Sequence, residues 1–414
     1  MPERKIIVLG GGFGGIRTAL ALAEESLPDT KIILISDKPH FEYMPALYRV
    51  VAGRSPLEVC IPLRDIFEGT RVEVLVDKIT EVDLGEKKLS GESGSHYIFD
   101  YCVLALGAET NYFNIPGLEE LSFGFKSITE ALKLKRHLHE AFESCESGTK
   151  EDKVCLAHIV IIGGGPTGVE LAGELSRYTK KLAKRHKLDE SLVTIDLIEA
   201  SPRLLSMLPE DFSKRIDNRL RRLGVNVFLN RTLIKEEVED VYMKDMKMKT
   251  KTVIWAAGVK PNHLLRKISG LEFDRGGRVL VNEFMEAKGF RDVFVIGDAA
   301  STAHSGMAQT ANNDGGYAAS AILARIKGKD EVKPYKQRAP YHAVPVGLNW
   351  AGAIVGPFKI YGLFGWWLRR LADLRFFLSI LPLKKAWSVF RDGKILSESC
   401  PVCLALLMES QEEF

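Results

Sequence analysis

Few cysteines, no long apolar run and no excess of charge are the first features of this chain. Its 414 residues include only six cysteines, which is no disulfide scaffold, so we expect a reducing, cytoplasmic compartment. No apolar run reaches the roughly 18 residues that span a bilayer, and a strand predicted from Lys5 onward leaves no room for a signal or transit peptide. The formal net charge of +3 gives no indication of nucleic-acid binding. At 46% hydrophobic residues the chain can form two or three globular domains.

The stretch from Ile159 to Glu170 carries the most specific signal. A β-branched run leads into Gly163, Gly165 and Gly168, and a helical pattern follows. This is the strand, turn and helix of a dinucleotide-binding unit, in which the glycines permit the turn, the approach of a pyrophosphate and close helix packing. The phosphates are then expected at a helix N-terminus, where N–H groups and the helix dipole favour negative charge.

A carboxylate for the ribose is expected about 20 residues or more beyond this turn. The predicted strand from Val193 to Ile198 ends in Glu199. A carboxylate there accepts hydrogen bonds from ribose hydroxyls and repels a 2′-phosphate. We therefore predict a preference for NADH over NADPH.

The same pattern opens the chain. A strand from Lys5 to Leu9 precedes Gly10, Gly12 and Gly15, and a helix is predicted from Ile16. Two such units in one chain predict that one domain is inserted into another.

The ribose acid of the first unit is ambiguous. The strand from Lys31 to Ile35 is followed by Ser36 and Asp37. We choose Asp37. The alternative is a solvated turn aspartate, with Ser36 in the equivalent place.

Further strands follow this unit. Val72 to Val76, Ile79 to Val82 and Tyr97 to Phe99 are predicted to form a small antiparallel excursion, with the polar run from Ser90 to His96 as one of its turns. A buried strand is predicted from Tyr101.

An aspartate later in the chain also has two interpretations. The strand from Val293 to Ile296 runs into Gly297 and Asp298, beside a predicted helix start. Asp298 can bind hydroxyls of a cofactor, or it can be a helix N-cap, or both. The helix predicted from Ala308 to Ile326 has polar residues near its start that can cap it or meet a bound ring.

The order of these motifs resembles the pyridine nucleotide:disulfide oxidoreductase superfamily over about residues 1 to 330. The segments that carry the resemblance are Gly10 to Gly15, Gly163 to Glu170, Trp255 to Val259 and Val295 to Asp298. Within the superfamily the chain is similar to type II NADH dehydrogenases, the single-chain flavoprotein NADH:quinone oxidoreductases. Supporting segments are His40 to Tyr48, Arg203 to Leu205 and Ala308 to Ala311.

The resemblance implies an α/β fold with two Rossmann-like domains, one for FAD and one for NADH. Glu170 is expected beside the nicotinamide, although a first-turn glutamate favoured by the helix dipole is the alternative. Gln309 is expected on the acceptor side, so Glu170 and Gln309 are the predicted catalytic residues. Asn313 stands where the family usually has a second glutamine, which leaves the quinone open.

The residues expected to bind the cofactors lie in both units and beside them. In chain order they are Gly10, Gly12, Phe13, Gly14, Gly15, Asp37, Lys38, Ala105, Gly107, Gly163, Gly165, Pro166, Thr167, Gly168, Glu199, Ala257, Gly258, Gly297, Asp298, Ala308 and Gln309. No metal site is predicted. The expected domains are an FAD domain at 1–112 and 263–335, an NADH domain at 113–262, and a C-terminal membrane or dimerisation region at 336–414.

The cysteines argue against a dithiol relay. None lies between His40 and Val50, where disulfide reductases of the superfamily place a pair, or between Ser301 and Ser399, where sulfide:quinone reductases need them. Cys60, Cys102, Cys145 and Cys155 are interpreted as small core or surface residues. Cys400 and Cys403 have the spacing of a redox dithiol or of half a zinc site, or they are an incidental pair.

The segment from Phe358 to Phe390 is apolar, aromatic and basic at once. An apolar stripe at helical spacing is predicted, with Arg369, Arg370 and Asp373 off the stripe, and cations far outnumber acids. This pattern predicts a helix lying in an anionic membrane interface, with a dimer contact or core helix as the alternative. The cations are Lys359, Arg369, Arg370, Arg375, Lys384, Lys385, Arg391 and Lys394.

The preferred function is that of a peripheral flavoenzyme at the cytoplasmic face of the cell membrane, which oxidises NADH and reduces a quinone without pumping protons. A homodimer is also considered. Alternatives are a sulfide:quinone reductase, a soluble NADH reductase of an electron-carrier protein, and a redox-sensing flavoprotein that binds a partner.

Overall fold

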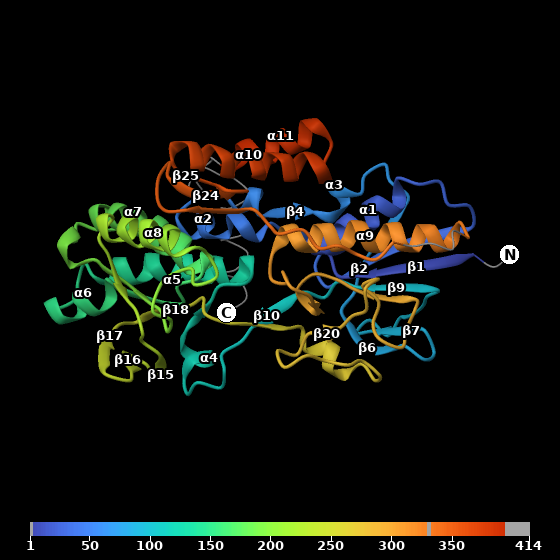
Figure 1. The fold of residues 1–414 in the computed structure, drawn as a ribbon. Helices are drawn as coiled ribbons and strands as arrows, with labels where there is room; N and C mark the ends of the chain where they lie inside the picture. The colour runs from blue at the N-terminus through green and yellow to red at the C-terminus, as the bar shows by residue number, and fades with distance from the viewer. Residues whose placement is uncertain (1–2, 329–332, 394–414) are drawn as a thin grey trace.

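The computed structural model describes residues 3–328 and 333–393 and forms two α/β units with a C-terminal layer over them (Figure 1). The first unit contains a parallel sheet in the order β21-β9-β1-β2-β5. Its strands are β1 (Arg4–Leu9), β2 (Thr30–Ser36), β5 (Val72–Val76), β9 (Tyr101–Leu104) and β21 (Val293–Val295). The central strand β1 is buried and apolar from Ile6 to Leu9, as expected where both faces of a parallel sheet are covered.

The second unit repeats this design. Its parallel sheet has the order β11-β18-β12-β13-β14. The strands are β11 (Phe123–Gly124), β12 (His158–Ile162), β13 (Thr194–Ile198), β14 (Val225–Phe228) and β18 (Thr252–Trp255). In both sheets the strand before the glycine turn is central, so each turn opens at the carboxyl edge beside the point where the strand order reverses.

The chain crosses between the units twice, at neighbouring places. Strand β10 (Ala108–Thr110) leaves the first unit, β19 (Val259–Pro261) returns to it, and the two pair antiparallel. Because β21 joins the first sheet after this return, the second unit is enclosed by two segments of the first. This agrees with the expected insertion, while the domain bounds themselves stay a prediction.

Helices α1 (Phe13–Ala23) and α9 (Ala308–Ile326) pack together over the first sheet (Figure 1). A Cβ at Gly315 of α9 would lie 2.4 Å from the Gly14 carbonyl oxygen. The two helices therefore approach closely because glycine stands at their contact.

The remaining helices and short strands complete the two units. The helices are α2 (Leu47–Val51), α3 (Leu63–Ile66), α4 (Leu118–Leu121), α5 (Ile128–Ser144), α6 (Lys150–Leu156), α7 (Pro166–Arg185) and α8 (Glu210–Arg222). The strands are β3 (His40–Glu42), β4 (Cys60–Pro62), β15 (Leu233–Glu237), β16 (Asp240–Met243), β17 (Met246–Lys249), β20 (Val279–Leu280) and β22 (Ala300–Ser301).

Two predictions for the antiparallel excursion were wrong. Strand β5 pairs in parallel with β2 and belongs to the main sheet. The excursion consists instead of β6 (Ile79–Asp83), β7 (Lys88–Gly91) and β8 (His96–Ile98). Strand β7 ends at Gly91 and β8 begins at His96, so both strands enter the stretch from Ser90 to His96 that was expected to be a turn.

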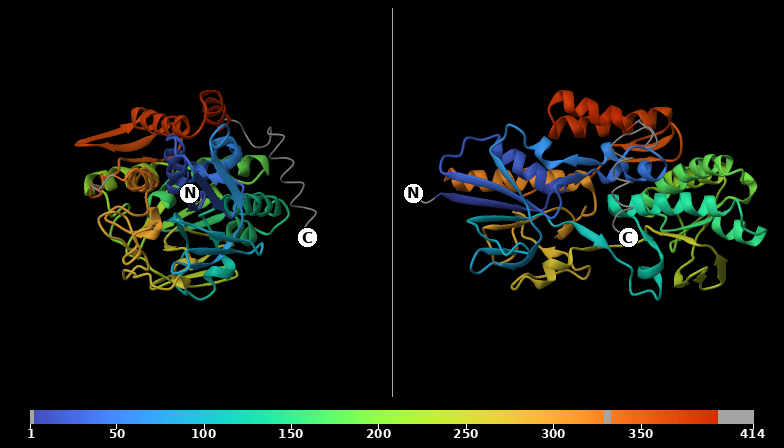
Figure 2. Two further views of the ribbon diagram at one scale, coloured as in Figure 1. Left: turned by 90° about the vertical axis from the view of Figure 1, so that its right-hand side faces the viewer. Right: turned by 180° about the vertical axis from the view of Figure 1, so that it is seen from behind.

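The C-terminal segment forms the antiparallel strands β23 (His342–Pro345), β24 (Ala351–Val355) and β25 (Phe358–Gly362), then helices α10 (Leu363–Ile380) and α11 (Leu383–Asp392). Both helices lie on the outside of the molecule in all views (Figures 1 and 2). The segment touches both units, since β23 packs on α7 while α10 reaches α1. No helix among residues 3–328 and 333–393 is long and apolar enough to cross a bilayer. Cys400, Cys403 and Lys394 lie outside the described residues.

Helix α10 buries three charged residues beside Phe377 and Ile380, and leaves most of its predicted apolar stripe exposed. Arg369, Arg370 and Asp373 are buried, whereas Phe364 and Leu371 are 76% and 54% exposed. The prediction that these two arginines meet an anionic interface was therefore wrong. Of the other expected cations, Lys359 pairs with Asp211, and Lys385 with Asp65 and Glu68. The exposed ones are Lys359, Arg375, Lys384 and Arg391.

His158 lies between two hydrogen-bond acceptors at the amino end of β12. Its Nδ1 lies 2.8 Å from the Lys249 carbonyl oxygen and its Nε2 lies 2.9 Å from Asp196 Oδ2. Both partners only accept, so both ring nitrogens must donate. Burial lowers the pKa of His158, but the hydrogen bond and charge of Asp196 outweigh burial and raise it above the usual 6.5.

We expect His158→Gln to lower the thermal unfolding midpoint most at acidic pH. A raised folded-state pKa contributes stability that is complete below the unfolded pKa of about 6.5 and is lost as pH rises through the folded value. The loss of stability should be about 1–3 kcal/mol at pH 6 and smaller at pH 9, measured by calorimetry. His263→Gln, at an exposed pair with Glu109, is the control. Equal destabilisation at both pH values would contradict the assignment.

Candidate active site

The two glycine turns have the same backbone geometry. Gly10 and Gly163 both have φ of 117°, a conformation that favours glycine. Their N–H groups donate to Ile35 and Ile198 across the sheet, at 2.8 Å in each case.

The later glycines of the turns also correspond. A Cβ at Gly15 would lie 1.9 Å from the Gly10 carbonyl oxygen, and a Cβ at Gly168 would lie 1.9 Å from that of Gly163. At Gly12 and Gly165 a Cβ would meet none of the described atoms within 4 Å. Each turn is thus tight where helix meets strand and open where a phosphate is expected.

A cavity of about 1390 Å³ opens between the units and the C-terminal segment. Fifteen of the predicted residues line it: Gly10, Gly12, Phe13, Gly14, Asp37, Lys38, Ala105, Gly107, Pro166, Thr167, Glu170, Gly297, Asp298, Ala308 and Gln309. The first glycine turn and the start of α7 therefore face one space. Such a volume can hold a large cofactor at the first turn, with the start of α7 at one end of the same space.

The other predicted residues lie away from this cavity. Gly15 is buried beneath its turn, and Gly163, Gly165 and Gly168 form the second turn. Ala257 borders Gly163, and Gly258 lies against the Phe113 ring. Glu199 stands at the end of β13, beside the second turn.

The two ribose positions differ in chemistry. Glu199 accepts hydrogen bonds from the N–H groups of Gly164, at 2.6 Å, and Ser201, at 2.7 Å. Ser36 occupies the equivalent place, because a Cβ at Gly11 would meet its hydroxyl as one at Gly164 would meet Glu199. Asp37 is one residue further, exposed and on the cavity wall. Ser36 and Asp37 therefore both remain candidates for the ribose of FAD.

Asp298 is not the N-cap of the long helix, contrary to one interpretation. It lies in a 3-10 turn (Gly297–Ala299), and α9 begins only at Ala308 with Met307 as its N-cap. Asp298 Oδ1 accepts from the Gly306 N–H at 3.1 Å, and Lys126 Nζ lies 3.5 Å from Oδ2. The carboxylate is held on the cavity wall, in reach of cofactor hydroxyls.

Gln309 is held in place by a backbone N–H group. Its Oε1 accepts a 2.8 Å hydrogen bond from the Tyr341 N–H. This bond leaves the amide N–H₂ of Gln309 directed away from that backbone, at the cavity wall.

Glu170 is the predicted residue with the most altered acidity. Burial raises its pKa to about 8, against the opposing effects of Arg369 and Arg49. Its carboxyl group is therefore mostly protonated at neutral pH. Glu170 also lines the cavity where the two units meet.

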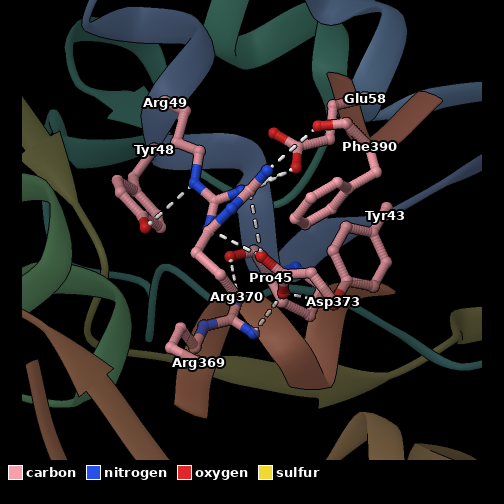
Figure 3. A network of polar contacts seen from close by, with 9 residues as sticks. All are labelled: Tyr43, Pro45, Tyr48, Arg49, Glu58, Arg369, Arg370, Asp373 and Phe390. Carbon is pink, nitrogen blue, oxygen red and sulfur yellow. Dashed lines mark hydrogen bonds and ion pairs between the residues drawn. The ribbon is translucent and has the colours of Figure 1, made fainter. Parts of the chain in front are cut away.

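The charges that act on Glu170 belong to a buried cluster that was not predicted. Figure 3 shows this cluster. Asp373 accepts from Arg369 at 2.5 Å, from Arg49 at 2.8 Å and from Tyr43 at 2.7 Å. Burial raises the pKa of Asp373, but the guanidinium groups outweigh this effect and hold it below its usual value. These bonds fasten α10 to α2 and to the segment before it.

A second carboxylate completes the cluster. Glu58 binds Arg49 at 2.8 Å and Arg370 at 2.6 Å, and Arg370 also lies over the Phe390 ring (Figure 3). Three guanidinium groups thus face two carboxylates, which leaves a positive charge in excess near Glu170. The sequence contained one clue, because Arg369 and Asp373 are four residues apart on a helix. Nothing local relates Arg49 and Glu58 to them.

Comparison with known proteins gives the family. Residues 4–315 match the model of the pyridine nucleotide-disulphide oxidoreductase family. The type II NADH:quinone oxidoreductase Ndh of Mycobacterium tuberculosis is 32% identical over 94% of this chain and 88% of its own length. The chain therefore belongs to the pyridine nucleotide-disulphide oxidoreductase family. A type II NADH:quinone oxidoreductase of Staphylococcus epidermidis is 27% identical over 95% of this chain and 99% of its own.

Solved structures share the fold. NDH2 from Plasmodium falciparum, in complex with NADH, has a TM-score of 0.85 at 20% identity and covers 94% of this chain and 97% of its own. The sulfide:quinone oxidoreductase of Aquifex aeolicus has a TM-score of 0.76 at 18% identity, with 94% and 92% covered. At these identities the similarity shows the fold alone.

The residues of the oxidoreductase fit the flavin that the family implies. The open Gly12 position, Asp298 and Gln309 all border the cavity. Asn312 adds a buried Oδ1 with no hydrogen-bond partner among the described residues, and it also lines the cavity. A polar ring with amide groups can satisfy that oxygen.

We expect Gly15→Ala and Gly168→Ala to separate the two cofactors. Each added methyl group would clash with a backbone carbonyl oxygen and force the backbone to shift. We expect this to lower the free energy of unfolding by about 1–3 kcal/mol. Gly168→Ala should keep its flavin and raise the NADH dissociation constant at least tenfold, whereas Gly15→Ala should purify with little flavin. Flavin absorbance and NADH titration measure these effects. Gly85→Ala, in an exposed turn, is the control. Loss of flavin from Gly168→Ala alone would reverse the assignment.

Proposed function

We propose that the oxidoreductase binds FAD at the first glycine turn and NADH at the second, and that it reduces a quinone without pumping protons. The observation that carries this proposal is the shared cavity, onto which the first turn and the start of α7 both open. The family match and the names of the relatives support it. When bound, FAD accepts a hydride from NADH and passes two electrons to the acceptor.

The chain itself supplies position and a proton. No nucleophilic side chain is required for such a transfer, so the glycine turns, Asp298 and Gln309 have a binding and orienting role. Reduction of a quinone by NADH also consumes one proton from solution. Glu170, protonated at neutral pH by its burial, lies on the cavity wall and can hold that proton.

Sulfide oxidation is the less favoured alternative. The chain shares the fold of a sulfide:quinone oxidoreductase, but the sequence has no cysteine between Ser301 and Ser399. Cys102 is buried, which raises the pKa of its thiol. Cys102 is therefore unsuited to supply the reactive thiolate of a sulfide-oxidising site.

We expect stopped-flow mixing under anaerobic conditions to show bleaching of the flavin by NADH at least tenfold faster than by NADPH, because Glu199 repels a 2′-phosphate. A water-soluble quinone should then restore the flavin colour, whereas sulfide should not bleach it. Protein without bound flavin that cannot be reconstituted would contradict the proposal. Reoxidation by a carrier protein but not by quinone would favour the soluble reductase.

We also propose that the exposed side of α10 and α11 is the membrane-facing surface of a peripheral enzyme. Its large apolar residues are Leu363, Phe364, Trp367, Leu371, Leu378, Leu383 and Trp387. Exposed Arg375, Lys384 and Arg391 lie among them and suit anionic headgroups. A lipid-soluble acceptor can reach the cavity from this side, because Leu371 and Arg375 also line it. We place this surface at the cytoplasmic side of the cell membrane.

We expect the double variant Phe364→Glu and Trp367→Glu, at exposed positions that do not line the cavity, to bind vesicles of phosphatidylglycerol and phosphatidylcholine at least tenfold more weakly, since carboxylates are costly in an apolar interface. Flavin reduction by NADH should be unchanged. Val238→Glu, 74% exposed on the second unit, is the control. A changed mass in light scattering with unchanged vesicle binding would make this face a homodimer contact instead.

A further inference from the structure

The loop between β13 and α8 is folded around one guanidinium group. Arg203 Nη1 donates to the carbonyl oxygens of Leu205, at 3.3 Å, and Leu208, at 2.6 Å. The same nitrogen donates to Ser213 Oγ of α8 at 2.7 Å, and Nη2 donates to the Ser206 carbonyl oxygen at 2.5 Å. One side chain thus holds three backbone carbonyls of a loop and ties them to the following helix.

This arrangement holds Leu205 in an unusual conformation. Leu205 has φ of 48°, in the left-handed region that costs an ordinary residue free energy. In that conformation its N–H donates to the Gly164 carbonyl oxygen at 2.8 Å. The loop is therefore bonded directly to the middle of the second glycine turn.

The ribose carboxylate belongs to the same bonded unit. Glu199 accepts from the N–H of Gly164 and from that of Ser201, at the start of the loop. A Cβ at Gly164 would lie 2.6 Å from Leu204, so the loop also packs on the turn. Direct hydrogen bonds therefore join the turn, the carboxylate and the loop.

We infer that Arg203 is a positioning residue for the adenosine half of the nucleotide. This inference rests on the proposed function, because it assumes that NADH binds at the second turn. Arg203 acts through the loop: its bonds compensate the strain at Leu205 and keep Gly164 and Glu199 where ribose and pyrophosphate meet them. Preorganisation of this kind strengthens binding without a new contact to the ligand.

The direction of the guanidinium separates this role from direct binding of phosphate. Both Nη atoms of Arg203 donate to the loop carbonyl oxygens or to Ser213. The guanidinium therefore binds the loop and not a ligand. An arginine that bound the pyrophosphate would make the affinity fall strongly with salt, since exposed charge pairs are screened. A positioning arginine would leave the ratio of variant to wild-type affinity independent of salt.

The test compares Arg203→Met and Arg203→Lys with the wild type as flavin-loaded full-length protein. We expect Arg203→Met to raise both the KM for NADH and the calorimetric Kd for ADP-ribose about tenfold. The kcat at saturating NADH and the flavin spectrum should stay within twofold. Arg203→Lys should be intermediate, because one ammonium cannot reach all four acceptors. The ratio of variant to wild-type Kd should be the same at 50 and 300 mM salt.

Arg221→Met is the matched control. Arg221 also lies in this unit, where its Nη2 donates to the Val227 carbonyl oxygen and its Nε pairs with Asp217, and it has no bond to the loop. We expect its Kd for ADP-ribose to equal that of the wild type.

Any one of three outcomes would overturn the inference and leave the proposed function intact. The first is an unchanged Kd for ADP-ribose in Arg203→Met. The second is a loss of kcat, flavin and thermal stability together, which indicates a purely structural role. The third is an effect that fades with salt, which indicates direct contact with a phosphate. Wild-type protein that keeps its flavin but binds neither ADP-ribose nor NADH would instead refute the proposed nucleotide site, and the inference with it.

Discussion

Close approach of helix to strand at two glycines is the constraint on which the rest of this molecule depends. At Gly15 and Gly168 there is no room for a Cβ, and only because of this contact does each helix begin directly at its glycine turn. The N-terminal N–H groups of α1 and α7 then face the place where phosphates are expected. In both units the carboxyl edge of the parallel sheet lies beside the glycine turn. The paired strands β10 and β19 join the two units.

Buried charge decides the orientation of the C-terminal helix. An amphipathic helix usually buries its apolar stripe. Here α10 buries Arg369, Arg370 and Asp373, because Arg49, Glu58 and Tyr43 offer partners that compensate the loss of hydration. The apolar stripe is left outside. The same cluster lies close enough to Glu170 to affect its acidity, so the fixing of the helix and the chemistry of the cavity are connected.

The sequence was most informative where function depends on local backbone geometry. Both glycine turns, the place of Glu199 at a strand end and the bounds of α9 follow from short patterns, because spacing in the chain there equals spacing in space. It was least informative where partners are distant. The pairing of β5 with β2 was missed, since apolar strands of both sheet types look alike in sequence.

By itself, the sequence determined the two nucleotide-binding units, their glycine turns and the acidic residue beside the second, because these features are encoded within a few tens of residues. Only the tertiary structure decided which face of α10 is buried, that Ser36 rather than Asp37 stands at the equivalent of Glu199, and that Arg203 holds a loop rather than facing solvent. For α10 the physical reason is that a charged side chain takes the partners that compensate its burial, and these come from elements far away in the chain. For Ser36 the reason is the register of its strand beside the first glycine turn. For Arg203 it is the course of the loop, which brings three backbone carbonyls around one guanidinium group.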